Sequence, residues 1–137
     1  MKARKLTQNQ RMQIWQKYGG RCAYCGELIE YKDMQVDHIK PKFRNWSESD
    51  KQNLLLKGYC GDDSMDNLNP SCRMCNFRKG TDTIEMFRNA IKHSLVCLER
   101  SFTYRLAKRY GLVKEIPQKV EFYFEVYNRE QQKLKSV

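Results

Sequence analysis

Two short cysteine pairs constrain the fold of this sequence more than any other feature. Cys22-Ala-Tyr-Cys25 and Cys72-Arg-Met-Cys75 are both Cys-x-x-Cys motifs. Together they supply the four thiolates that a tetrahedral structural Zn²⁺ requires. The pairs are separated by 46 residues, more than in a simple zinc ribbon, so further structure must be built between them. The spacing therefore predicts a zinc site that joins two distant segments.

Other uses of the cysteines are less consistent with the sequence. A redox-active Cys-x-x-Cys usually follows a strand and opens a helix within βαβ units, and no such pattern is present. No secretion signal or long apolar run is visible, so we expect a soluble, cytoplasmic protein with reduced thiols. Two cysteines remain outside the motifs. We expect Cys60 to be a loop thiol rather than a stray ligand, and Cys97 to be a small core residue.

The charge of the chain is strongly positive and unevenly distributed. The 26 Lys and Arg and 16 Asp and Glu give a net charge of +10. Residues 1–22 contain six basic and no acidic side chains, and residues 67–137 contain 14 basic and 7 acidic ones. The stretch 27–66 has 9 acidic and 6 basic side chains. Basic flanks of this kind suit a polyanion, although charge alone is equally consistent with a role in solubility.

Local patterns predict an α+β chain. A capping box of Thr7 and Gln10 begins a helix over 8–18, which Gly19-Gly20 ends. Alternation predicts a strand over 33–39, and the turn-rich segment 41–66 reads as a long loop. Apolar residues every three or four positions predict one long helix from Asp82, capped with Glu85, to Gly111. Alternation over 120–127 predicts a C-terminal strand.

The chain length of 137 residues favours a single domain. We divide it into a basic arm and helix (1–20), a core that carries both cysteine pairs (21–80), and a helical extension with a final strand (81–137).

Polar residues between and beside the cysteine pairs carry a family resemblance. The runs GGRCAYCG, MQVDHIKPK and DNLNPSCRMCNFRKG resemble the HNH endonuclease superfamily, in its branch with two zinc knuckles. The resemblance covers roughly residues 10–80, and Asn76 stands where the family name has its final His. It implies a ββα-metal (His-Me finger) core stapled by a zinc ion with four cysteine ligands.

The resemblance also implies a role for each residue. His38 is expected to be the general base, Asp37 and Asn76 the ligands of a catalytic Mg²⁺ or Mn²⁺, and Asn67 the residue that holds the His38 loop. Carboxylate and amide oxygens do suit such cations. Neighbours on a strand point to opposite faces, so His38 is free to take a proton from water. Asn69 competes with Asn67 for its position.

Several further residues have a functional and a structural interpretation. Asp66 is either an additional metal ligand or, more commonly for its type, a turn residue. We interpret His93 as structural. The residues predicted to contact a phosphate backbone are Lys79, Arg78, Arg73 and Lys40. Cations of the predicted long helix and of the N-terminal arm could also contact duplex phosphates: Arg88, Lys92, Arg100, Arg105, Lys108, Arg109, Lys2, Arg4 and Lys5.

The sequence thus predicts a metal-dependent endonuclease, most readily of DNA, in a phage, mobile-element or other bacterial context. The alternatives are a non-catalytic zinc-stapled module that binds nucleic acid or protein, and a nuclease directed at RNA. The acidic loop 41–66 is a candidate site for a protein partner. No membrane partner is expected, and the sequence is equally consistent with a monomer and with a homodimer.

Overall fold

The fold is α+β, with a two-stranded antiparallel sheet and six α-helices in the part of the chain described. The computed structural model describes residues 5–42, 49 and 61–136. Three of the predicted residues lie outside the described part of the chain: Lys2, Arg4 and Cys60. Most of the loop 41–66, the candidate site for a protein partner, also lies outside it. Within the described residues, no helix is both long and apolar enough to cross a membrane.

The core unit consists of short elements. Helix α1 spans Gln8–Gln16, strand β1 spans Gln35–His38, strand β2 spans Leu68–Ser71 and helix α3 spans Arg73–Lys79. Two 3₁₀ turns, η1 (Tyr31–Asp33) and η2 (Met65–Asn67), precede the two strands. β1 and β2 pair so that Asp37 faces Asn69 and His38 faces Leu68. The order β1, β2, α3 agrees with the ββα unit that the resemblance implies.

Local signals account for two of these elements. The predicted capping box is confirmed, because the Thr7 hydroxyl accepts from the Gln10 amide while the Gln10 side chain accepts from the Thr7 amide. The strand predicted over 33–39 is also confirmed, with slightly narrower bounds.

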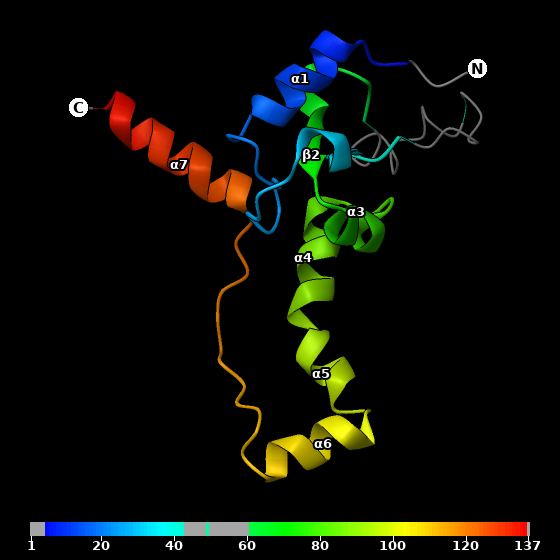
Figure 1. The fold of residues 1–137 in the computed structure, drawn as a ribbon, viewed down its shortest axis with the longest axis vertical. Coiled ribbons are helices and arrows are strands. Elements are labelled where there is room, and N and C mark those ends of the chain that lie inside the picture. Colours follow the sequence, from blue (N-terminus) through cyan, green and yellow to red (C-terminus); the bar gives the residue numbers. More distant parts are fainter. Residues whose placement is uncertain (1–4, 43–48, 50–60, 137) are drawn as a thin grey trace.

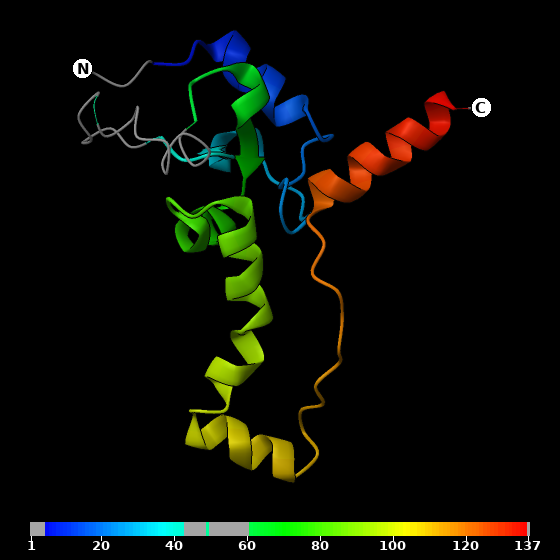
Figure 2. The same ribbon diagram turned by 180° about the vertical axis from the view of Figure 1, so that it is seen from behind.

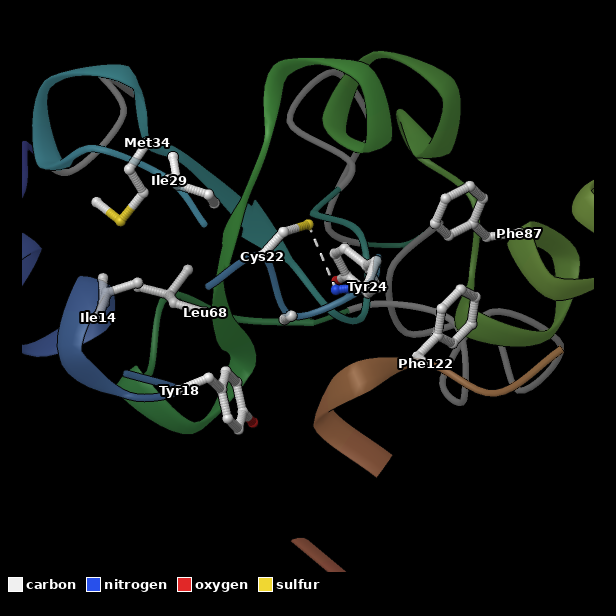
Figure 3. Packing of buried hydrophobic residues seen from close by; sticks show 10 residues of the cluster. Ile14, Tyr18, Cys22, Tyr24, Ile29, Met34, Leu68, Phe87 and Phe122 are labelled. Carbon is white, nitrogen blue, oxygen red and sulfur yellow. Dashed lines mark hydrogen bonds between the residues drawn. The ribbon is translucent and has the colours of Figure 1, made fainter. Parts of the chain in front are cut away.

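The hydrophobic core lies between α1, the sheet and the root of the C-terminal helices. Figure 3 shows its two halves: aliphatic residues around Ile14 and Leu68, and an aromatic group around Tyr24. Tyr24 packs edge-on against Phe87 and Phe122, whose rings stack on each other at 5.2 Å. This aromatic group attaches the C-terminal half of the chain to the first cysteine pair.

The predicted long helix is three helices. They are α4 (Ile84–Lys92), α5 (Ser94–Leu98) and α6 (Phe102–Arg109). Thr83, not Asp82, caps α4 by accepting from the Met86 amide, and Ser101 caps α6 by accepting from the Tyr104 amide. Figures 1 and 2 show α4 and α5 as a column leading away from the core, with α6 across its far end.

The predicted C-terminal strand is wrong. Residues Tyr123–Lys135 form helix α7, which begins against the first cysteine pair. The amides of Tyr123 and Phe124 donate to the carbonyls of Tyr24 and Ala23, at 3.1 and 2.8 Å. First-turn amides of a helix lack partners within the helix, so these carbonyls stabilise its start. The alternating residues 120–127 have no strand to pair with in the part described.

Cys97 is exposed, which contradicts its predicted place in the core. The prediction assumed that the apolar face of a continuous helix packs against the body of the protein. Here α5 contains no buried residue.

Candidate active site and cysteine cluster

The four cysteines of the two motifs form one cluster. All four Sγ atoms lie within 4.8 Å of one another, and the Sγ atoms of Cys25 and Cys72 are 3.8 Å apart. A tetrahedral Zn²⁺ with Zn–S bonds of about 2.3 Å places its ligand sulfurs about 3.8 Å apart. The cluster therefore has the donor chemistry and the dimensions to hold one zinc ion.

Short backbone turns present the thiols. The Cys22 sulfur accepts from the Tyr24 amide, drawn as a dashed line in Figure 3, and the Cys72 sulfur accepts from the Cys75 amide, both at 3.4 Å. The Ala23 amide donates to the Pro70 carbonyl at 2.9 Å, which joins the first turn to β2. Cys72 is also the N-cap of α3. The cluster thus positions α3 relative to the sheet.

The thiols strongly influence one another's ionisation. A hydrogen bond from Cys75 lowers the pKa of Cys22 to about 4, and the same contact raises the pKa of Cys75 well above its ordinary value. Burial raises the pKa of Cys25 to about 11. Without a cation the cluster therefore favours one thiolate over several, and four thiolates require a metal ion to balance their charge.

His38 lies at the end of β1 and faces an acidic partner. Its Nε2 is 2.8 Å from Asp63 Oδ1, and its side chain is 21% exposed. Lys42 makes a second ion pair with Asp63. Hydrogen bonds from Lys42 and His38 lower the pKa of Asp63. Asp63 therefore remains a carboxylate at neutral pH and orients the imidazole.

Asn67 holds the backbone that follows His38. Its Oδ1 accepts from the Lys40 amide at 2.9 Å, and its Nδ2 donates to the carbonyls of Lys40 and Asp62 at 3.0 and 2.8 Å. Gly61 packs so closely here that an added Cβ would lie 2.2 Å from the Lys40 oxygen. This position accepts only glycine without a backbone shift.

Asn69 has a different environment from Asn67. It is fully buried, its Oδ1 accepts from Lys17 at 3.3 Å, and its Nδ2 has no hydrogen-bond partner in the described part of the chain. Of the two candidates, Asn67 is the one that reaches the His38 loop.

Replacing Asn67 by alanine should expose this loop to solvent without unfolding β1. The Lys40 amide would lose its acceptor, and one lost hydrogen bond of about 1.4 kcal/mol corresponds to a roughly tenfold increase in its exchange rate. The Ile39 amide donates to the backbone oxygen of Asn67 at 2.9 Å and provides an internal control, because the substitution leaves this acceptor in place. Hydrogen exchange followed by NMR measures both amides. Equal acceleration of the two would show that the strand itself had opened.

Asp37 points to the opposite face of β1 from His38, as strand alternation predicts. It is only 4% exposed, and it pairs with the Tyr24 hydroxyl and with Lys79, whose Nζ lies 3.1 Å from Asp37 Oδ2. The Lys79 ammonium also donates to the His38 carbonyl at 2.7 Å. Burial raises the pKa of Asp37, and Lys79 opposes that rise.

The burial of Lys79 corrects its predicted role as a phosphate contact. Its residue exposure is 1%, so its ammonium cannot meet a nucleic-acid backbone in this arrangement. The other three predicted contacts, Lys40, Arg73 and Arg78, are exposed.

Asn76 lies on α3, one residue after the last cysteine of the cluster. Its side chain is half-buried and makes no hydrogen bond within the described residues. β1 and α3, which carry Asp37 and Asn76, pack against each other. Of the other sequence candidates, Asp66 and His93 are exposed.

Comparisons with known proteins found structural similarity over part of the chain. No family model matches it, and no curated protein matches it. Among solved structures it is similar to the Type II-C Cas9 enzyme from Actinomyces naeslundii, with 25% identity over 58% of this chain and a TM-score of 0.44. The match spans 8% of the Cas9 chain.

Three contributors to this region carried too little signal to be predicted. Asp63, Tyr24 and Gly61 lie 25, 13 and 21 positions from the residues that they contact (His38, Asp37 and Lys40), and each belongs to a common residue type for a loop or a core. Only the Gly-Asp-Asp order at 61–63, a turn-forming pattern shortly before Asn67, hinted at a constrained loop.

Proposed function

We propose that this chain is an endonuclease that hydrolyses phosphodiester bonds, most readily in DNA, with His38 as the general base. The observation that carries the proposal is the pairing of a partly exposed imidazole with Asp63, above a loop fixed by Asn67. A general base needs access to water, a defined orientation and a group that stabilises its protonated form.

The two imidazole nitrogens would divide these tasks. When Nε2–H donates to Asp63, the neutral ring carries its lone pair on Nδ1. Nδ1 would then accept the proton of the attacking water, while the Asp63 carboxylate stabilises the imidazolium that forms. The exposed cations Lys40, Arg73 and Arg78 are proposed to contact the phosphate backbone.

The proposed divalent cation does not fit Asp37 in the arrangement described. Asp37 and Asn76 offer the hard oxygen donors that Mg²⁺ or Mn²⁺ prefers, but the carboxylate is buried and already neutralised by Lys79. A cation would reach Asp37 only if Lys79 left it. The proposed proton transfer therefore involves only His38 and Asp63, and cleavage in Mg²⁺, in Mn²⁺ and in EDTA tests cation dependence separately.

Substituting His38 by alanine tests the proposal. Loss of a general base lowers the rate by about 10²–10⁴-fold, so cleavage should nearly vanish. Supercoiled, linear and branched DNA, and RNA, are incubated with the protein in Mg²⁺, in Mn²⁺ and in EDTA. The cleavage products are then resolved on gels.

The matched control is His93→Ala, which removes the other histidine of the chain at an exposed position. Equal cleavage by the His38 and His93 variants would refute the assignment of His38. Binding without cleavage by the unmodified protein under every condition would favour the non-catalytic alternative, and preferential cleavage of RNA would change the substrate.

A further inference from the structure

Residues 92–119 carry an excess of cations that the chain does not neutralise. The segment contains seven Lys and Arg and only two acidic residues, Glu99 and Glu115. Lys108 forms ion pairs with both of these carboxylates. Five cations are exposed and form no ion pair with the described residues: Lys92, Arg100, Arg105, Arg109 and Lys114. A surface of this kind attracts a polyanion.

Helix α6 brings two of these cations and two apolar residues to one face. Arg105 and Arg109 are four positions apart, and side chains at this spacing are neighbours on the surface of a helix. Phe102 and Leu106 have the same spacing. One concavity of about 520 Å³, here called the α6 groove, is lined by Glu99, Phe102, Arg105, Leu106, Lys108 and Arg109. The groove therefore combines charged and apolar contacts.

The apolar part of the α6 groove includes an aromatic ring that is open to solvent. Phe102 is 71% exposed and Leu106 is 44% exposed. Tyr110, one further turn along the chain, is 77% exposed. Exposed rings beside arginine side chains can bind flat ligands by stacking and by cation–π contacts.

The charged part of the α6 groove is available to a ligand. Three cations line the groove against one carboxylate, Glu99, which is already paired with Lys108. Lys108 also pairs with Glu115, and the Tyr104 hydroxyl donates to Glu115 at 2.7 Å. These contacts fix α6 against the segment that follows it. Arg105 and Arg109 remain unpaired on a surface of defined shape.

We propose that the α6 groove binds a single-stranded segment of nucleic acid. One base stacks on Phe102, and the neighbouring phosphates pair with Arg105 and Arg109. Proteins that bind single strands without sequence preference combine these two elements, aromatic rings for the bases and a cationic groove for the backbone. The four residues that line the groove beside one another supply both elements.

Other occupants use only part of this surface. The bases of a duplex are stacked on each other, so a duplex would pair with the arginines and leave Phe102 in water. A second copy of the chain would bring like charges together. Unpaired cations also continue on both sides of α6 in sequence, at Arg100 and Lys114. A strand with one phosphate per nucleotide offers a partner to each of them.

The test measures the binding of a fluorescent oligothymidylate, and of a DNA duplex of equal length, to the full chain. Fluorescence anisotropy is recorded in EDTA at a series of salt concentrations. We expect the single strand to bind more tightly than the duplex. Phe102→Ala should weaken single-strand binding by about 5- to 100-fold, the effect of removing a stacking ring, and should leave duplex binding unchanged.

A second variant tests the cations. Arg105→Gln with Arg109→Gln should reduce the slope of log K against log salt by about 1.4, because each phosphate contact with a single strand contributes about 0.7. The substituted residues are exposed, so the fold should remain intact, which circular dichroism verifies.

The matched controls lie on α7, away from α6 (Figure 1). Leu134→Ala removes an exposed apolar side chain, and Lys133→Gln with Lys135→Gln removes two exposed cations. Neither control should change the affinity for the single strand as the α6 variants do.

Three results would overturn the proposal. They are duplex binding as tight as single-strand binding, equal losses in the α6 and α7 variants, and displacement of the oligonucleotide by polyglutamate at the same concentration of charge. The last result would assign the groove to an acidic protein. Because binding rather than cleavage is measured, a protein that binds through the groove without cutting would contradict only the proposed function.

Discussion

Replacing Cys75 by serine is expected to unfold the unit of β1, β2 and α3. Zinc bound by four thiolates contributes apparent free energies of about 10–16 kcal/mol in small zinc domains, comparable with the whole free energy of unfolding of a typical domain, about 5–15 kcal/mol. In this chain the cluster joins the turn at Cys22 to the N-terminus of α3. Loss of one ligand should therefore remove zinc and lower the thermal unfolding midpoint by tens of degrees.

The chain provides its own control for this experiment. Cys97 is exposed and lies outside the cluster, so Cys97→Ser should retain one zinc per chain and the unmodified midpoint. Zinc is measured by elemental analysis, and unfolding by circular dichroism with and without a chelator. A zinc-free protein with an unchanged midpoint would show that the cluster is not a structural zinc site.

Removing the Lys79 ammonium should destabilise the fold by about 3–5 kcal/mol, because it leaves the carboxylate of Asp37 buried and unpaired. Lys79→Met keeps most of the side-chain volume and removes only the charge and its donors. For a chain of this length, the thermal midpoint should fall by about 10–20 °C. Arg78→Met is the matched control, since Arg78 is the neighbouring cation on α3 and its side chain is 62% exposed. Equal midpoints for the two variants would show that the Asp37–Lys79 pair is absent in solution.

The pH dependence of Lys79→Met gives this prediction a definite sign. Burial raises the pKa of Asp37 and Lys79 opposes the rise, so removal of Lys79 should raise that pKa further. A folded-state pKa above the unfolded value means that the folded protein binds the proton more tightly. The destabilisation should therefore be full at neutral pH and should shrink as pH falls through the raised pKa of Asp37. Unfolding by denaturant at a series of pH values measures it.

The parts of the fold predicted from sequence are those specified by nearby residues. The capping box at Thr7 involves a partner three positions away. In β1, apolar and polar residues alternate because one face of the strand packs against the core. The spacing within each Cys-x-x-Cys motif specifies a local turn. Because the chain contains two such motifs, each is the obvious partner of the other in a four-cysteine site. Each of these signals lies within a few consecutive residues, so it can be recognised in the sequence alone.

The predictions that failed depended on contacts distant in sequence. α7 begins where the Tyr123 and Phe124 amides meet carbonyls about 100 residues earlier, and nothing in the alternating 120–127 segment reveals this. Lys79 looked like a free cation beside Arg78, but Asp37, 42 positions away, makes it an internal one. The second break in the predicted long helix occurs where Ser101 caps α6, a signal that the apolar periodicity obscured.

The contact between Arg88 and Val120 also gives the chain a modular topology. Arg88 and Val120 are 32 positions apart in sequence, yet they touch through a single hydrogen bond. A segment whose two ends meet is an insertion in the topological sense, and its length can change without moving the residues on either side of the junction. The cysteine cluster and the His38 loop contribute no residue to the segment between Arg88 and Val120. Proteins that share this core can therefore differ widely between these two positions, and their likeness would be found by aligning the halves separately.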